Sequence, residues 1–211
     1  MTIPISEIYN SVQGESSFVG LPTTFIRTAG CPMRCRWCDT PHSFDGGTPY
    51  TIKELLNKIT CPYVCITGGE PLIHEDILSL MTQLCDRGYK ISLETNGGMP
   101  IDEVDPRVAV IMDIKCPGSE MEERNLWENI DALLGHHEVK FVISDRDDYD
   151  YSVEICKQHH LFTKVAHVLF SPAFDEIEPK LLASWIIEDK LPARLNLQTH
   201  KFIWPKETKG V

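Results

Sequence analysis

The sequence predicts one α/β domain, built as a parallel-stranded, incomplete (partial) barrel of the TIM type. Seven continuous apolar runs are typical of strands in a covered parallel sheet, and helical segments separate most of them. The chain has 211 residues, whereas a complete eightfold barrel usually needs about 250. We therefore expect a single domain over residues 1–211, whose six or seven strand–helix units leave the barrel open.

The expected strands are short apolar segments bounded by polar or glycine-rich residues. In chain order they are 23–29 (TTFIRTA), 63–67 (YVCIT), 89–95 (YKISLET), 108–114 (VAVIMDI), 138–144 (EVKFVIS), 166–171 (AHVLFS) and 194–198 (RLNLQ). Because their apolar runs are continuous rather than alternating, we expect all of them to run parallel.

Five helical segments are expected between these strands: 51–59, 75–88, 125–135, 149–159 and 178–189. Thr51, followed by Glu54, predicts a capping box at the start of the first helix. Gly88 and Gly135 suit the C-terminal ends of the second and third helices. The segment 29–50 has no helical pattern, so it predicts a long functional loop after the first strand.

Composition and charge argue against several classes of function. The formal net charge is −11 and the basic residues are scattered, so we expect no nucleic-acid-binding face. No apolar run is long enough for a membrane span, and the N-terminus lacks the pattern of a signal peptide. We expect a cytoplasmic protein, in which a tight group among the eight cysteines indicates metal binding rather than disulfides.

Polar or glycine-rich motifs follow each predicted strand. They are the cysteine cluster, TGGEP (67–71), ETNGG (94–98), DIK (113–115), Ser144, SP (171–172) and QTHK (198–201). In parallel α/β folds the carboxyl ends of the strands meet on one face, where ligands bind. These motifs therefore predict one site at that face.

Cys31, Cys35 and Cys38 form the pattern C-x3-C-x2-C. Structural zinc and four-iron clusters both normally take four protein ligands, so three thiolates leave one coordination site open. A zinc knuckle and reduced core cysteines are the alternatives. Cys61 and Cys65 repeat the first spacing, but in a strand they would lie about 13 Å apart, so we expect them to be core residues.

With Trp37 just before Cys38, this cluster resembles that of the radical S-adenosylmethionine (SAM) superfamily. The resemblance implies a 4Fe–4S cluster held by the three thiolates, with SAM bound at the open iron, and a partial barrel of the radical SAM type. TGGEP at the end of the second strand agrees with it, because Gly68 and Gly69 permit close backbone approach to the methionine part of SAM.

Within the superfamily, the stretches SVQGES (11–16), CDT (38–40) and QTHK (198–201), together with Arg27, resemble the 7-carboxy-7-deazaguanine synthase family. The resemblance implies a carbon–nitrogen lyase that converts 6-carboxy-5,6,7,8-tetrahydropterin to 7-carboxy-7-deazaguanine with loss of ammonia, in queuosine precursor biosynthesis. It also implies Mg²⁺, flavodoxin or ferredoxin as the electron donor, and a homodimer.

The resemblance also assigns site residues, none of them as a side-chain acid or base. Thr40 would bind Mg²⁺. The residues expected around SAM are Trp37, Gly69, Glu70, Asp113, Ile114, Lys115 and Ser171. The residues expected around the pterin are Val12, Gln13, Gly14, Glu15, Arg27, Thr67, Asn96, His200 and Pro205. Arg27 would pair with the substrate carboxylate, as a planar bidentate donor should.

Several of these assignments have structural alternatives. Arg27 could form a structural ion pair, Thr40 could cap a turn, and Asp113 could pair with Lys115 rather than contact SAM. His200 could be a hydrogen-bonding histidine with no ligand. Two departures from the family pattern are Ser16, where glycine is expected, and the tail KETKGV beyond Pro205.

Two other functions remain open from the sequence. A glycyl-radical-enzyme activase is also a short radical SAM protein, but it acts on a large protein partner and would not need a pterin pocket. A zinc-binding interaction module would use the same cysteines without catalysis.

Overall fold

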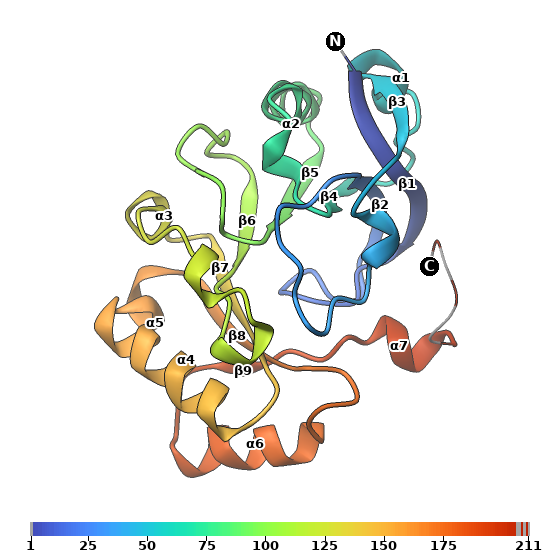
Figure 1. Ribbon diagram of the computed structural model, residues 1–211. Coiled ribbons are helices and arrows are strands. Elements are labelled where there is room, and N and C mark those ends of the chain that lie inside the picture. Colours follow the sequence, from blue (N-terminus) through green and yellow to red (C-terminus); the bar gives the residue numbers. More distant parts are fainter. Residues whose placement is uncertain (1, 206–207, 209, 211) are drawn as a thin grey trace.

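The computed structural model describes residues 2–205, 208 and 210. Its strands form one open sheet in the order β3-β1-β2-β4-β5-β6-β7-β8-β9, which Figure 1 shows as a curved wall with helices on its outer side. The strands are β1 Thr2–Val12, β2 Pro22–Thr28, β3 Thr48–Thr51, β4 Tyr63–Gly68, β5 Lys90–Thr95, β6 Ala109–Asp113, β7 Glu138–Ile143, β8 His167–Pro172 and β9 Arg194–Leu195. The α-helices are α1 Ile52–Leu56, α2 Asp76–Asp86, α3 Asn129–Ala132, α4 Arg146–Gln158, α5 Leu161–Lys164, α6 Pro179–Glu188 and α7 His200–Ile203.

A strand lies at each of the seven predicted places, and these strands pair in parallel from β2 to β9. The last one is shorter than the expected 194–198, since β9 contains only Arg194 and Leu195. The sheet also contains two strands that were not predicted, β1 and β3, and β1 pairs antiparallel with both β2 and β3. The sequence reading missed β1 because its apolar residues alternate with polar ones, as in TIPISEIYNSV. A search for continuous apolar runs passes over such a strand.

The helices fit the predictions unevenly. The capping box of Thr51 and Glu54 is present, and Gly88 follows α2 with φ of 82°. Two predicted helices are much shorter than expected, since 51–59 contains only the five residues of α1 and 125–135 only the four of α3. Gly135 therefore does not end a helix. The expected loop 29–50 contains a short 3-10 turn at Pro41–Ser43 and the start of β3.

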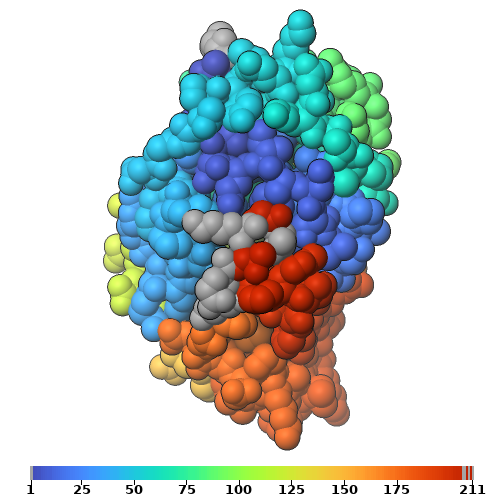
Figure 2. Space-filling view, turned by 90° about the vertical axis from the view of Figure 1, so that its right-hand side faces the viewer, coloured from blue at the N-terminus to red at the C-terminus, as the bar shows by residue number. Residues whose placement is uncertain are grey.

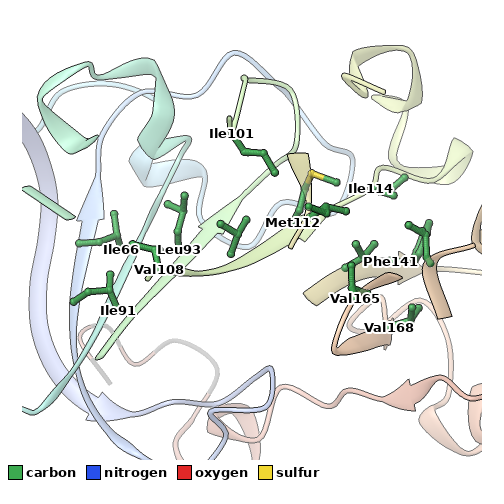
Figure 3. Packing of buried hydrophobic residues seen from close by; sticks show 14 of the residues in the cluster. Ile66, Ile91, Leu93, Ile101, Val108, Met112, Ile114, Phe141, Val165 and Val168 are labelled. Carbon is green, nitrogen blue, oxygen red and sulfur yellow. The ribbon is translucent and has the colours of Figure 1, made fainter. Parts of the chain in front are cut away.

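Successive residues of each strand face opposite sides of the sheet. One side, the outer face, carries buried apolar residues such as Ile66, Leu93, Met112 and Phe141, which pack with α2, α4, α5 and α6 in one core (Figure 3). The other side, the inner face, carries residues such as Arg27, Thr67, Glu94, Asp113 and Lys140, all of which line one cavity. The core thus lies outside the open barrel and the cavity inside it.

Two segments cross the gap that the open sheet leaves. The loop after β1 reaches the far strands, where Ser17 N donates to the Glu138 carboxylate at 3.2 Å and Ser16 N donates to Asn196 Oδ1 at 2.9 Å. The chain after β9 returns to this loop, and Thr199 N donates to Gly14 O at 2.9 Å. Figures 1 and 2 show this C-terminal segment, in red, lying against the N-terminal strands.

Among the residues that the structure describes, no helix has the length and apolar character needed to cross a membrane.

Candidate functional site

A cavity of about 650 Å³ lies inside the open barrel, lined by the inner face and by the loops that follow the strands. It gathers most of the residues that the sequence analysis selected. The lining includes Val12, Gln13, Gly14, Glu15, Arg27, Cys31, Cys35, Trp37, Cys38, Thr40, Thr67, Gly69, Asn96, Asp113, Lys115, Ser171, His200 and Pro205. Two selected residues do not line it: Glu70 is fully buried, and Ile114 packs in the outer core.

The three selected cysteines lie on the loop after β2, and all three face the cavity as free thiols. Arg34 holds this loop from outside, since its Nη1 donates to Cys31 O at 2.7 Å. The loop also contacts the turn after β6, where Arg36 N donates to Ser119 O at 3.2 Å. Backbone and guanidinium contacts therefore fix the path of the loop without using the thiols.

The turn after β4 packs directly against the cysteine loop. A Cβ atom on Gly69 would overlap Gly30 O and lie 2.9 Å from Cys31 Cβ, so only glycine fits there. Glu70 N donates to Gly30 O at 2.8 Å, and the Glu70 carboxylate accepts from Thr95 Oγ1 and Asn96 N at 2.9 and 2.7 Å. Glu70 therefore joins the turns after β2, β4 and β5 from beneath the cavity.

The three thiols suit a metal cluster in which sulfide ions, rather than side chains, bridge the metal atoms. Three soft thiols on one loop are the ligands that iron–sulfur centres select. Asn96 Nδ2 lies 3.7 Å from Cys31 Sγ, a neighbour of the kind that tunes a cluster by hydrogen bonding. For a single ion, no group of three His, Cys, Asp or Glu side chains in the described residues is suitably arranged. The cysteines fit a 4Fe–4S cluster, whose ligands surround a larger body than one ion.

Thr40 and Trp37 flank Cys38 at the rim of the cavity. Thr40 precedes the turn Pro41–Ser43, but its side chain makes no capping hydrogen bond. Its Oγ1 instead lies 3.8 Å from Cys38 Sγ. The Arg36 guanidinium lies over the Trp37 ring, 4.9 Å from the ring centroid.

Arg27 projects from β2 into the cavity with its guanidinium held on two sides. Nε donates to Glu7 Oε2 at 3.0 Å, and Nη2 donates to Tyr9 OH at 3.2 Å. Glu7 also contacts His42 Nε2 at 3.2 Å. The ion pair that the sequence left open as an alternative is thus present, and the guanidinium still lines the cavity.

Glu94 of β5 lies at the centre of a second polar group. It accepts from Gln13 Nε2 at 3.1 Å and from Thr67 Oγ1 at 2.9 Å. Gln13 Oε1 in turn accepts from Gly14 N at 2.8 Å, which shapes the loop after β1. The carboxylate of Glu94 lines the cavity beside Arg27 and is joined to two of the residues expected around the pterin.

Four charged side chains alternate in sign across the inner face. Lys115 Nζ lies 2.9 Å from Asp113 Oδ2, Lys140 Nζ lies 3.4 Å from Asp113 Oδ1, and Lys140 Nζ donates to Glu15 Oε2 at 3.0 Å. Burial raises the pKa of the Asp113 carboxyl, but the charges of Lys115 and Lys140 outweigh it, so that pKa lies below its usual value. The pairing of Asp113 with Lys115 is therefore present, although both residues also face the cavity.

The C-terminal segment covers the side of the cavity next to Gly14. A Cβ atom on Gly14 would overlap the His200 ring, so the ring lies directly on this glycine. Gln198 Nε2 and Lys201 Nζ both donate to Asp39 Oδ2, at 3.2 and 3.0 Å, on the cysteine loop. Burial lowers the pKa of His200, which favours its neutral form at pH 7. Ser171 accepts from Asn196 Nδ2 at 2.8 Å and is held by the same segment.

Among the lining residues to which the sequence analysis gave no role, six make the polar contacts described above: Glu7, Tyr9, Asp39, Glu94, Lys140 and Gln198. Four of them lie on strands and share the inward parity of Arg27, Thr67 and Asp113. A polar residue at every second position of an otherwise apolar parallel strand is the signal that would have found Glu94 and Lys140. The tail KETKGV, which departs from the family pattern, lies mostly outside the described residues, since these do not include 206–207, 209 and 211.

Known proteins resemble this chain along its whole length. Residues 25–112 match the radical SAM superfamily. The 7-carboxy-7-deazaguanine synthase of Koribacter versatilis is 45% identical, with 98% of this chain and 99% of that protein covered. The one of Chlorobaculum tepidum is 42% identical, with 98% and 96% covered. The one of Clostridium acetobutylicum is 31% identical, with 100% of both covered.

Solved structures show the same fold. The crystal structure of QueE from Escherichia coli matches with a TM-score of 0.77 and 27% identity, and 95% of each chain is covered. SuiB from Streptococcus suis, bound to the precursor peptide SuiA, has a TM-score of 0.54 and 13% identity, covering 82% of this chain and 47% of that one. The second likeness shows the fold alone.

Proposed function

Because the chain belongs to the 7-carboxy-7-deazaguanine synthase family of radical SAM enzymes, we propose that it converts 6-carboxy-5,6,7,8-tetrahydropterin to 7-carboxy-7-deazaguanine. The reaction contracts the reduced ring and expels ammonia. Product and ammonia together contain all the atoms of the substrate, so the overall step is redox-neutral.

One observation carries this proposal: the three thiols and the buried Arg27 face the same cavity. A cluster site alone would serve any radical SAM enzyme. The Arg27 side chain is only 15% exposed; Glu7 and Tyr9 engage Nε and Nη2, which leaves Nη1 for an anionic ligand in the cavity. The carboxylate of the pterin is such a ligand, and a planar fork binds it with defined geometry.

The chain would hold the cofactors at one end of the cavity. Cys31, Cys35 and Cys38 would bind the cluster, and Asp113, which lines the same cavity beside Lys115 and Lys140, would face SAM. When bound, the cluster and SAM supply a 5′-deoxyadenosyl radical that removes a hydrogen atom from C6 of the pterin. The inner face excludes water from this end of the site and fixes the distance between the two ligands.

The pterin would lie between β2, β5 and the loop after β1. Arg27 would bind its carboxylate, Glu94 would accept from the donors of the pyrimidine ring, and the loop around Gly14 would lie against the ring. His200 would cover the ring from the C-terminal segment. Proton movements in the reaction have no assigned side chain, since the polar groups here are engaged in positioning.

Thr40 would supply one oxygen to Mg²⁺, with the substrate carboxylate and water as the other ligands. Its Oγ1 is not used for capping, and Mg²⁺ commonly binds through few protein oxygens. We also propose that the protein takes its electron from flavodoxin or ferredoxin and works as a homodimer, as the family resemblance implies.

Anaerobic reconstitution tests the function directly. The protein is loaded with iron and sulfide, then supplied with SAM, a reductant, Mg²⁺ and 6-carboxytetrahydropterin. We expect a product with the mass of 7-carboxy-7-deazaguanine and one equivalent of ammonia, at a rate that falls when Mg²⁺ is withheld. SAM cleavage with no conversion of the pterin would contradict the substrate assignment and favour the glycyl-radical activase.

A further inference from the structure

Lys140 is the residue at which two parts of the site meet. It lies on β7 directly beside Asp113 of β6, because the register of the two strands pairs these positions. Its Nζ is 3.4 Å from Asp113 Oδ1 on one side and 3.0 Å from Glu15 Oε2 on the other. Asp113 belongs to the group expected around SAM, and Glu15 to the loop expected around the pterin.

Each oxygen of the Glu15 carboxylate is held by a donor from another part of the chain. Oε2 is bound by Lys140, and Oε1 accepts from Gln198 Nε2 at 2.9 Å. The side chains of Glu15 and Lys140 are only 15% and 14% exposed. Glu15 therefore joins the loop after β1 to β7 and to the C-terminal segment, and it does so inside the molecule rather than at the surface.

The pair of Glu15 and Lys140 is one of several contacts that hold the loop after β1. Ser16 N and Ser17 N also donate to Asn196 and Glu138 across the gap, and the loop carries Gln13 and Gly14 to the cavity. Gln13 is oriented by Glu94, but Glu15 is anchored to a strand by the charge of Lys140. Without that charge, Glu15 would be a buried carboxylate facing a neutral amide, an arrangement that costs more than exposure to water.

We propose that Lys140 is a positioning residue for the reaction. Its ion pair with Glu15 holds the loop expected to bind the pterin, and its ion pair with Asp113 holds the part of the site expected to bind SAM, so that Lys140 ties the two parts together. This role rests on the proposed function for its two ligands, although the tie itself is a property of the chain. It places no atom on a reacting group. Its effect is to hold the two binding regions at one separation, on which hydrogen transfer between the ligands depends.

The test compares Lys140→Met, Lys140→Arg and Glu15→Gln with wild type, and uses Lys157→Met on the exposed face of α4 as the matched control. Hydrogen exchange is measured first, without SAM or pterin. Lys140→Met should speed exchange in residues 13–21 and 198–204 and leave α4 unchanged, whereas Lys140→Arg should stay near wild type because the charge is kept. Equal exchange in all variants would overturn the proposal, as would faster exchange throughout the chain.

Turnover is measured next. Losing one member of a buried charge pair predicts a fall in kcat/KM of at least about thirtyfold for Lys140→Met, with a raised KM and more 5′-deoxyadenosine released per product. The double variant Glu15→Gln/Lys140→Met should be little worse than Lys140→Met alone, because both changes break the same tie. Additive losses, or an unchanged ratio of 5′-deoxyadenosine to product, would contradict it.

The two measurements keep this proposal separate from the proposed function. If wild type does not convert the carboxypterin but Lys140→Met still speeds hydrogen exchange in residues 13–21, the substrate assignment fails and the positioning role of Lys140 is supported. If wild type converts the pterin and Lys140→Met matches it in exchange and turnover, the function stands and the role of Lys140 is refuted.

Discussion

The two faces of the sheet bury different kinds of side chain: apolar residues on the outer face and charged residues on the inner face. On β7, Val139 and Phe141 point outward and are fully buried in the core, while Lys140 between them points into the cavity. On β6, Met112 packs in the core and Asp113 faces inward. The outer face buries apolar surface, which stabilises the fold. The inner face buries charges, which costs free energy unless each is paired.

This difference explains why the inner face consists of paired groups. Lys140 lies between two carboxylates, Arg27 lies between Glu7 and Tyr9, and Glu94 accepts from Gln13 and Thr67. An open barrel can hold such a network because its interior need not be filled with aliphatic side chains, as a closed one is. Changes on the outer face should therefore act on stability, and changes on the inner face on ligands.

The largest effect is expected at the end of the inner face, where the cysteine loop lies. Replacing Cys31, Cys35 or Cys38 by Ala should abolish SAM cleavage, because two thiolates do not hold a four-iron cluster with one open site. Iron content and release of 5′-deoxyadenosine after anaerobic reconstitution measure this. Cys61→Ala and Cys65→Ala are the controls and should keep both. Equal iron loss from the controls would show that the cluster has other ligands.

Neighbouring positions on β7 provide the sharpest contrast between the faces. Phe141→Ala should lower the free energy of unfolding by about 3–5 kcal/mol, since it leaves a cavity and removes the edge contact with Phe170 at 5.7 Å between ring centroids. Val142→Ala, one residue further and facing the ligand cavity, should cost much less. Urea unfolding of the two variants measures the difference. Similar losses at both positions would mean that the inner face carries a core of its own.

Arg27→Ala should act on the substrate and spare the cofactors. Removing the partner of a buried carboxylate costs about 2–5 kcal/mol, or roughly thirtyfold to several thousandfold in affinity. Arg27→Lys should also bind poorly, because an ammonium lacks the planar fork. Calorimetric titration with the carboxypterin and with SAM separates the two ligands. If Arg27→Ala binds the pterin like wild type, the ion pair with Glu7 is its whole role.

The smallest effect is a pH dependence outside the site. Burial, and then the charge of the neighbouring His136, lower the pKa of His137 to about 4. In the unfolded chain His137 has an ordinary pKa near 6.5 and binds a proton between pH 6.5 and 4, whereas in the folded chain it stays neutral. The free energy of unfolding therefore falls as the pH drops from about 6.5 to 4. The slope for this one proton is at most about 1.4 kcal/mol per pH unit.

His137→Asn should flatten that slope, because an amide oxygen can still accept from Leu134 N as Nδ1 does at 3.1 Å. The exposed His160→Asn serves as the control and should keep the wild-type slope. Unfolding free energies at several pH values between 4 and 7 measure both. A slope that is the same in wild type and His137→Asn would show that other groups govern acid stability.

The sequence by itself determined the class of chemistry and the outline of the fold. The three cysteines lie within eight residues of one another, and the glycines of TGGEP follow a strand directly. Their spacing is local, so it is readable without a structure, and the radical SAM family that it indicated is confirmed. The seven parallel strands were readable for a similar reason, because each is a short segment rich in apolar residues that a polar or glycine-rich motif follows.

Only the tertiary structure decided how the site is held together. Glu15 and Lys140 are 125 residues apart in the chain, and Gln198 is 183 residues from Glu15. Nothing local links such positions: they meet because the strand register sets Lys140 beside Asp113 and because the open barrel leaves a gap for the loop after β1 to cross. The antiparallel β1 was missed for a different reason, since its apolar residues alternate with polar ones. The position of Lys140 in its strand predicts that it faces inward, but the residues it contacts there follow only from how distant segments pack together.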